Sequence, residues 1–248
     1  MNNKKIQSGS AHLIVVILLV LALIGALGFV YYQNFIQKKA SDTSTTDTTG
    51  TGSTITYKTY TDSLYNATFQ YPDNWSVGTL TVSSFDPSYN RILDIKNDNT
   101  IIVATLDLGV SGIGGTCANE NGVPQLTTIT VLDSTLSSVK ATKPVAASFI
   151  VTKANDRPSG YYAAYGLSDS YTAISDYNVC MPYITFETTS LGDNNDKYGI
   201  MFGNSGFLSA SSSPTFKTKY FATLDDARAY IASNEYKEIK KMLLSLTY

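Results

Sequence analysis

The hydrophobic and polar positions divide the chain into an apolar start, a polar connector and a long body. Residues 13–30 contain no polar side chain, and two tyrosines extend this run to residue 32. A helix of that length rises about 30 Å, which is the thickness of the hydrocarbon core of a bilayer. Pairs of lysines flank the run on both sides. The pattern therefore predicts one transmembrane helix over residues 13–32, preceded by a tail of residues 1–12.

A cleaved signal peptide is the alternative interpretation of the same run. Ala26 and Gly28 are small residues separated by one position, as in the cleavage sites that signal peptidase prefers. The cut would then fall before Phe29, but the apolar run continues beyond that point. This continuation favours an uncleaved anchor in the lipid bilayer.

The connector has the composition of a flexible tether. Residues 40–54 consist of seven Thr, three Ser, two Asp, two Gly and one Ala, so they cannot form a hydrophobic core. A flexible chain of that length reaches about 20 Å. We interpret residues 33–54 as a juxtamembrane segment and linker, which would hold a folded domain of residues 55–248 away from a membrane surface.

The body alternates short runs rich in β-branched and aromatic residues with turn sequences, a pattern typical of β-strands. Strands are expected over residues 55–60, 67–71, 76–82, 91–95, 101–108, 127–132, 148–153, 161–167, 183–188, 198–202 and 216–221. Residues 101–104 are apolar on both faces, which predicts a central strand.

The spacing of the apolar residues changes from a strand pattern to a helical pattern at the carboxyl end. Thr223 is positioned to cap a helix, and apolar residues then recur at helical spacing as far as Leu246. Ser233 and Asn234 interrupt the pattern, so we expect two helices, the second capped by Asn234. The predicted fold class is α+β: a mostly antiparallel sheet with carboxyl-terminal helices packed on it, preceded by the transmembrane helix.

The two cysteines, Cys117 and Cys180, both lie in the body. Their even number and the lack of a C-x-x-C spacing favour a disulfide formed outside the cytoplasm. Two buried free thiols in a reducing compartment are the alternative. Together with the linker, the cysteines favour an amino terminus inside the cell and a body outside it.

The charge and the histidine content exclude several classes of function. The net charge is −2 and only 15% of residues are charged, so no cationic surface is expected to bind a nucleic acid. The single histidine, His12, lies outside the expected body. A histidine-dependent triad, a histidine general base and a histidine metal site are therefore excluded from the body.

Two loops resemble ligand-binding motifs but lack a required residue. Residues 109–116 are rich in glycine but lack the lysine of a phosphate-binding loop. Residues 193–196 carry acids and amides but lack the terminal glutamate of a calcium loop. We therefore expect no cofactor and assign no catalytic, cofactor-binding or metal-binding residue.

An aromatic string is the most informative local motif. Phe69, Tyr71, Pro72 and Trp75 form the sequence F-x-Y-P-x-x-W, which predicts a strand, a turn and a following strand. A core role for these aromatic residues is the main interpretation, and a platform on which a ligand stacks is the alternative. The string resembles the opening of PsbP-like domains, and Leu244-Ser245-Leu246 resembles their closing helix. That resemblance implies a non-enzymatic binding or assembly module.

A basic start, an apolar helix and a β-rich body with one disulfide also resemble type IV pilins. A pilin would need a glutamate five residues after the cleaved glycine, but Ile14 stands there if Gly9 is that glycine. The linker would also interrupt the long helix on which pilin filaments are built.

We therefore expect a single-pass protein of a bacterial cell membrane that displays a non-enzymatic binding or assembly domain outside the cell. Its expected partners are the lipid bilayer, through residues 13–32, and an extracytoplasmic protein or envelope ligand. A pilin-like filament subunit is one alternative. A carboxylate-dependent hydrolase of the cell envelope is another, and it requires two carboxyl groups about 5–10 Å apart in a cleft.

Overall fold

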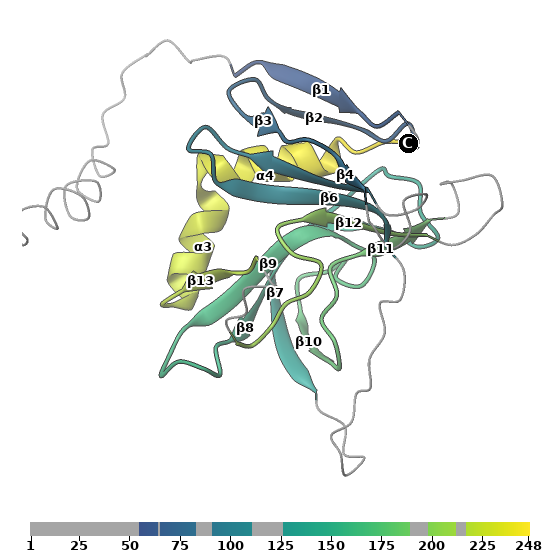
Figure 1. Ribbon diagram of the computed structural model, residues 1–248. Helices are drawn as coiled ribbons and strands as arrows, with labels where there is room; N and C mark the ends of the chain where they lie inside the picture. Colours follow the sequence, from purple (N-terminus) through teal and green to yellow (C-terminus); the bar gives the residue numbers. More distant parts are fainter. Residues whose placement is uncertain (1–54, 64, 83–90, 111–125, 189–197, 212–216) are drawn as a thin grey trace, which may run out of the picture. The chain divides into compact units, whose positions relative to one another are not determined.

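The computed structural model covers most of the body outlined by the hydrophobic pattern (Figure 1). It describes residues 55–63, 65–82, 91–110, 126–188, 198–211 and 217–248. Among these residues, no helix combines the length and the apolar character needed to cross a membrane. The predicted tail (1–12), transmembrane helix (13–32) and linker (33–54) lie outside the described residues and stay predictions.

Strands dominate the described residues, and the strand pairs are antiparallel. The strands are β1 (Tyr57–Thr61), β2 (Thr68–Pro72), β3 (Ser76–Val77), β4 (Thr81–Val82), β5 (Arg91–Lys96), β6 (Ile102–Val110), β7 (Thr127–Leu136), β8 (Ala146–Lys153), β9 (Tyr161–Ser168), β10 (Asp176–Val179), β11 (Phe186–Thr188), β12 (Tyr198–Gly203) and β13 (Lys219–Phe221). The helices α3 (Leu224–Ala232) and α4 (Asn234–Leu244) follow at the carboxyl end. An antiparallel sheet with carboxyl-terminal helices is therefore confirmed.

One sheet joins most strands in the order β10-β7-β8-β9-β12-β6-β5-β3. β13 attaches to β9, β11 to β12 and β4 to β5, whereas β1 and β2 form a separate hairpin (Figure 1). Backbone hydrogen bonds of 2.7 and 2.9 Å join Thr68 of β2 to Thr247 near the chain end. β6 lies inside the sheet, as the apolar run at 101–104 predicts.

Several strand boundaries differ from the predicted ones because pairing partners determine them. β7 continues to Leu136 instead of residue 132, since β8 pairs with it along that length. The predicted strand 76–82 is divided into β3 and β4, and 183–188 shortens to β11. β10 is absent from the predicted strands; it pairs with β7, where Thr130 Oγ1 donates a hydrogen bond to Asp176 Oδ1 at 2.6 Å.

Each helix begins after a residue that caps it. The Asp226 N–H donates to Thr223 Oγ1 at 3.1 Å, and the Thr223 N–H donates to Asp226 Oδ2 at 3.2 Å, which makes a capping box. The predicted cap of the second helix, Asn234, is wrong by one residue. Ser233 is the cap because its backbone is extended, and its Oγ accepts from the Tyr236 N–H at 3.2 Å.

Alternate residues of the central strands serve two hydrophobic cores on opposite faces of the sheet. On β8, Phe149 belongs to the larger core and Ile150 to the smaller one. The larger core includes the buried residues of α4, which are Tyr236, Ile239, Met242 and Leu243. The helices therefore cover one face of the sheet.

β9 and β12 approach so closely that only glycine fits at their contact, where Gly166 pairs with Gly203. A Cβ on Gly203 would lie 2.1 Å from the Tyr165 carbonyl oxygen and 2.6 Å from the Gly166 Cα. β12 ends there, and the buried Asn204 continues the pairing. Its N–H donates to the Tyr165 carbonyl at 3.0 Å, and its Oδ1 accepts from the Tyr165 N–H at 2.7 Å.

We predict that Gly203→Ala destabilises the protein by about 3 kcal/mol, because a methyl group there meets backbone atoms that cannot rotate away. Gly78→Ala is the matched control, since its Cβ would lie 3.3 Å from the nearest atom, the Asp94 carbonyl oxygen. Urea denaturation of the full chain in detergent micelles, followed by the fluorescence of the single tryptophan, Trp75, measures both changes. Equal stability of the two variants would contradict the prediction.

Candidate functional site

A pocket lies on the face of the sheet opposite the larger core. Ile92 of β5, Asp107 of β6 and Met201 of β12 form its floor and lie side by side in the strand register. Leu93, Leu106 and Phe202, which alternate with them along the strands, belong to the larger core, so the three floor side chains project away from it. The pocket encloses about 310 Å³, at the lower end of the range for small-molecule sites.

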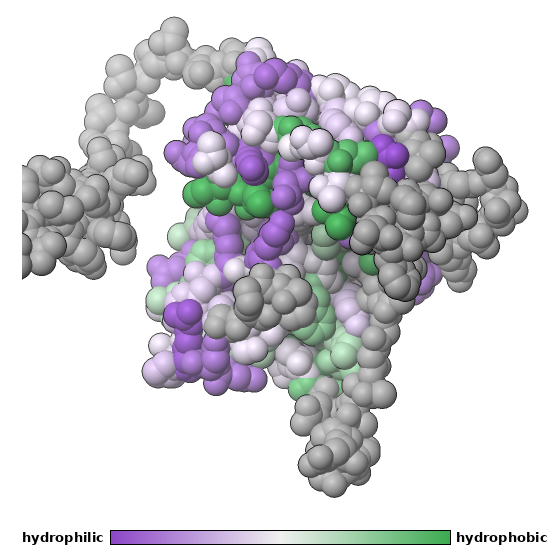
Figure 2. Space-filling view, viewed as in Figure 1, coloured by the Kyte–Doolittle hydropathy of each residue, from purple (hydrophilic) through white to green (hydrophobic). Residues whose placement is uncertain are grey.

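The face of the described residues that is visible in Figure 2 carries both hydrophobic and hydrophilic side chains. On the face seen in Figure 2, hydrophobic residues show as separate areas among hydrophilic ones. Dispersed apolar residues are ordinary for a solvent-exposed surface. A local hollow is therefore a better candidate for function than this visible surface as a whole.

One wall of the pocket is an aromatic pair, Tyr183 and Phe207. Their ring centroids lie 5.5 Å apart, and their backbones form an isolated antiparallel bridge. The Ile184 N–H donates to the Gly206 carbonyl at 2.9 Å, and Ser205 Oγ donates to the Phe207 carbonyl at 2.7 Å. These bonds hold both rings at the edge of the pocket.

Asp107 is the unusual residue of the floor. Its Oδ1 is buried and has no hydrogen-bond partner in the described part of the chain. Burial disfavours the charged carboxylate, and it raises the pKa of Asp107 from 3.8 to about 7. At neutral pH this carboxyl therefore exchanges between its acid and its ionised form.

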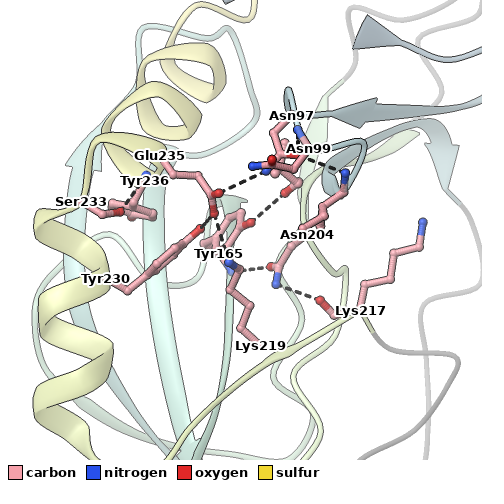
Figure 3. Close-up of polar contacts among 12 residues, drawn as sticks. Asn97, Asn99, Tyr165, Asn204, Lys217, Lys219, Tyr230, Ser233, Glu235 and Tyr236 are labelled. Atoms are coloured by element: carbon pink, nitrogen blue, oxygen red, sulfur yellow. Dashed lines mark hydrogen bonds and ion pairs between the residues drawn. The ribbon is translucent and has the colours of Figure 1, made fainter. Parts of the chain in front are cut away.

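The other charged groups that the described residues bring beside the pocket, Asp94 and Lys217, are paired with each other. Lys217 Nζ lies 3.0 Å from Asp94 Oδ1 and 3.4 Å from Thr105 Oγ1, and Thr105 Oγ1 also donates to Asp94 at 3.1 Å. Asn204 Nδ2 donates to the Lys217 carbonyl at 2.9 Å, which ties the segment before β13 to the end of β12 (Figure 3). The Asp94–Lys217 pair is neutral overall, so Asp107 is the charged side chain without an opposite charge among the described residues that line the pocket.

A second polar cluster surrounds Glu235, at the start of α4 (Figure 3). Its carboxylate accepts hydrogen bonds from Tyr230 Oη at 2.8 Å, Lys219 Nζ at 3.1 Å and Asn97 Nδ2 at 3.2 Å. Burial acts to raise the pKa of Glu235, but these three donors outweigh it and lower the pKa. The cluster joins α3, α4, β13 and the turn after β5, so we interpret it as structural.

The aromatic residues singled out in the sequence lie away from the pocket. Phe69 and Trp75 are in the larger core, and the Phe69 ring lies 5.1 Å from that of Phe202. Pro72 is buried and Tyr71 is partly buried against the same core. The structure therefore places this motif where the core interpretation expects it.

Cys180 is disulfide-bonded. Cys117, the only other cysteine in the sequence, lies outside the described residues, so the predicted pairing is not itself described. Residues 111–116 of the glycine-rich loop and residues 193–196 of the acidic loop also lie outside the described residues. Within the described ranges, no group of three or more His, Cys, Asp or Glu side chains is arranged to hold a metal ion.

Ser137 and Lys140 form an S-x-x-K sequence, the spacing of a serine nucleophile and its lysine base in some hydrolases. They lie in the connection between β7 and β8, where Ser137 Oγ accepts a hydrogen bond from the Val139 N–H at 3.2 Å. Residues three apart face each other on a helix, but this segment is not helical. The sequence match therefore carries no catalytic assignment.

Asp107, Tyr183 and Phe207 are missing from the residues predicted from sequence. A signal for Asp107 was available, because it is an acid between Leu106 and Leu108 in a strand that is otherwise mostly apolar. The aromatic wall had no comparable signal. Tyr183 and Phe207 are joined only by an isolated bridge between segments that are far apart in the chain.

We predict that Asp107→Asn stabilises the protein more at pH 8 than at pH 4. The folded state binds more protons than the unfolded state between about pH 4 and 7, because burial raises the pKa of Asp107 to about 7. The wild type therefore loses stability as pH rises through this window. The variant does not undergo this loss, which is on the order of 4 kcal/mol for a pKa raised from 3.8 to about 7. Urea denaturation at both pH values measures it, with the exposed Asp98→Asn as control. An equal effect at pH 4 and pH 8 would show that ionisation is not involved.

Comparison with known proteins found no matching family model, curated protein or solved structure. The resemblances to PsbP-like domains and to type IV pilins therefore stay predictions, and the pocket geometry carries the functional argument.

Proposed function

We propose that residues 55–248 form a ligand-binding domain, displayed outside the cytoplasm by an anchor at residues 13–32, and that Asp107 marks its ligand pocket. The observation that carries this proposal is the Oδ1 of Asp107, which receives no hydrogen bond from the described residues and lies in a pocket of about 310 Å³. Leaving a buried acceptor without a hydrogen bond costs about 1–3 kcal/mol. A ligand that supplies the missing donor recovers that free energy on binding.

The surroundings of Asp107 have the composition of a small-molecule site. Such sites combine aromatic and apolar walls with a few polar groups that orient the ligand. Here Tyr183, Phe207 and Met201 supply the apolar surface, and Asp107 supplies the acceptor. Strong pKa shifts inside a cleft are also characteristic of functional sites.

The extracytoplasmic location rests on the sequence and on Cys180. The apolar run, the linker and the cysteine count favour export, and a disulfide bond at Cys180 is typical of an oxidising compartment. A domain on a flexible linker can meet soluble ligands or envelope components while its anchor stays in the bilayer.

A carboxylate-dependent hydrolase is a second candidate because two acids share the pocket face. Asp94 pairs with Thr105 across β5 and β6, and Asp107 lies two residues further along β6. Diagonal neighbours of this kind have Cα atoms about 7–8 Å apart. Asp107 would be the general acid, whereas Asp94, paired with Lys217, would be the ionised partner.

We predict that the full chain in detergent micelles binds at least one of three matched probes: benzylamine, benzyl alcohol or benzoate. Gly206 lines the pocket, and a Cβ there would point at the flexible side chain of Met201, so Gly206→Leu should fill the pocket and abolish binding. Thr59→Leu, at an exposed position of β1, is the control and should bind as the wild type does. Saturation-transfer NMR measures the binding of each probe to the wild type and to both variants. Binding of none of the probes, or equal binding to the Gly206→Leu variant, would contradict the proposal.

The hydrolase candidate makes a different prediction. It requires the wild type to release reducing ends from purified cell-wall polysaccharide. Both Asp94→Asn and Asp107→Asn should lower the rate of this release by about 100-fold or more. The binding proposal instead expects Asp94→Asn to retain binding of the neutral probe, benzyl alcohol, because Asp94 does not line the pocket. Turnover that depends on both Asp94 and Asp107 would support the hydrolase candidate in place of the binding proposal.

A further inference from the structure

We infer that the ligand of this pocket carries an ammonium group on an apolar body, and that Asp107 is the residue that binds the ammonium. The inference rests on the proposed binding function and names its ligand class. It stands on three observations: the charge balance around the pocket, the orphan acceptor and the aromatic wall.

The charge balance favours a cation. Asp94, from β5, and Lys217, from the segment before β13, neutralise each other at 3.0 Å. Tyr183 Oη lies 2.8 Å from Met181 Sδ, in a hydrogen bond that turns the hydroxyl toward the methionine. β12 contributes the uncharged Met201 to the floor. Once Asp107 is ionised, the charged groups that the described residues place beside the pocket sum to minus one, which complements a single positive charge.

The orphan acceptor also favours an ammonium over a neutral donor. A hydrogen bond between charged groups is roughly twice as strong as one between neutral groups, and the low dielectric of a partly buried site strengthens it further. An anion is disfavoured, because it would bring a like charge close to Asp107. Lys217 offers little compensation to an anion, since Asp94 and Thr105 already occupy its ammonium group.

The aromatic wall explains why an apolar body is expected beside the charge. The rings of Tyr183 and Phe207 lie next to each other at the pocket edge, and Met201 and Ile92 line its floor. An aromatic face attracts a nearby cation through the negative charge of its π face, and it also buries an apolar chain. A bare inorganic cation would leave this surface without a partner.

Ammonium binding should depend on pH through Asp107. The ligand binds the ionised carboxylate, whereas burial keeps much of the carboxyl protonated below about pH 7. Affinity should therefore rise about tenfold per pH unit from pH 5 to pH 6 and level off above pH 7, while an aliphatic amine stays protonated throughout. A neutral ligand of the same shape should show no such rise.

The test compares benzylamine with benzyl alcohol on the full chain in detergent micelles, by NMR titration at pH 5, 6, 7 and 8. At pH 8 we expect benzylamine to bind at least tenfold more tightly than benzyl alcohol. Asp107→Asn should lower the affinity for benzylamine at least tenfold and abolish the pH dependence of that affinity. The Asp98→Asn variant is the control, and circular dichroism checks that each variant is folded.

Equal binding of the alcohol and the amine, or unchanged benzylamine binding by Asp107→Asn, would overturn the ammonium inference but leave the binding proposal intact. Binding of no probe at any pH would overturn both. Nα-acetyl-lysine methylamide is a second cationic probe that distinguishes the two sources of the group. Tighter binding of this probe than of benzylamine supports a lysine side chain of a protein or peptide, and the reverse order supports a free amine.

Discussion

The close contact between Gly166 and Gly203 is the constraint on which the sheet depends. Without side chains at this point, β9 and β12 meet, and the strands on either side of them become one sheet. The same contact determines where β12 ends, and Asn204 then binds the Tyr165 backbone and the Lys217 carbonyl. Residues 205–207 follow directly and form part of the pocket wall. The pocket is thus a consequence of how two strands cross and separate.

Two acids of this domain show how differently one fold can treat a carboxyl group. Glu235 is surrounded by three donors, which keep it ionised and make it a junction between the helices and the sheet. Asp107 is also withdrawn from water, but its Oδ1 receives no donor within the described structure. The first arrangement stabilises the fold, whereas the second costs stability at neutral pH. Such a cost is common where a protein keeps a group ready for a ligand.

Local pattern predicted much of the fold, because alternation and capping act over a few residues. β2, β5 and β9 begin and end within a residue or two of the predicted ranges, and Thr223 caps α3 as expected. β10 escaped prediction because its four mostly polar residues become a strand only through pairing with β7. The pocket could not be predicted for a similar reason. Asp107 stands out in its strand, but tertiary contacts place the aromatic residues beside it.

The β1–β2 hairpin determines how the domain would respond to a pull from its amino-terminal side. Tension from the predicted anchor at residues 13–32 would enter the described chain at β1, and Tyr57 pairs with Pro72 at the open end of the hairpin. A pull there separates the strand pairs one at a time rather than all together. β2 is held independently by Thr247, so the hairpin would lengthen under load before the force reached the main sheet. The pocket, which lies on the main sheet, would then keep its shape while the hairpin took up the displacement.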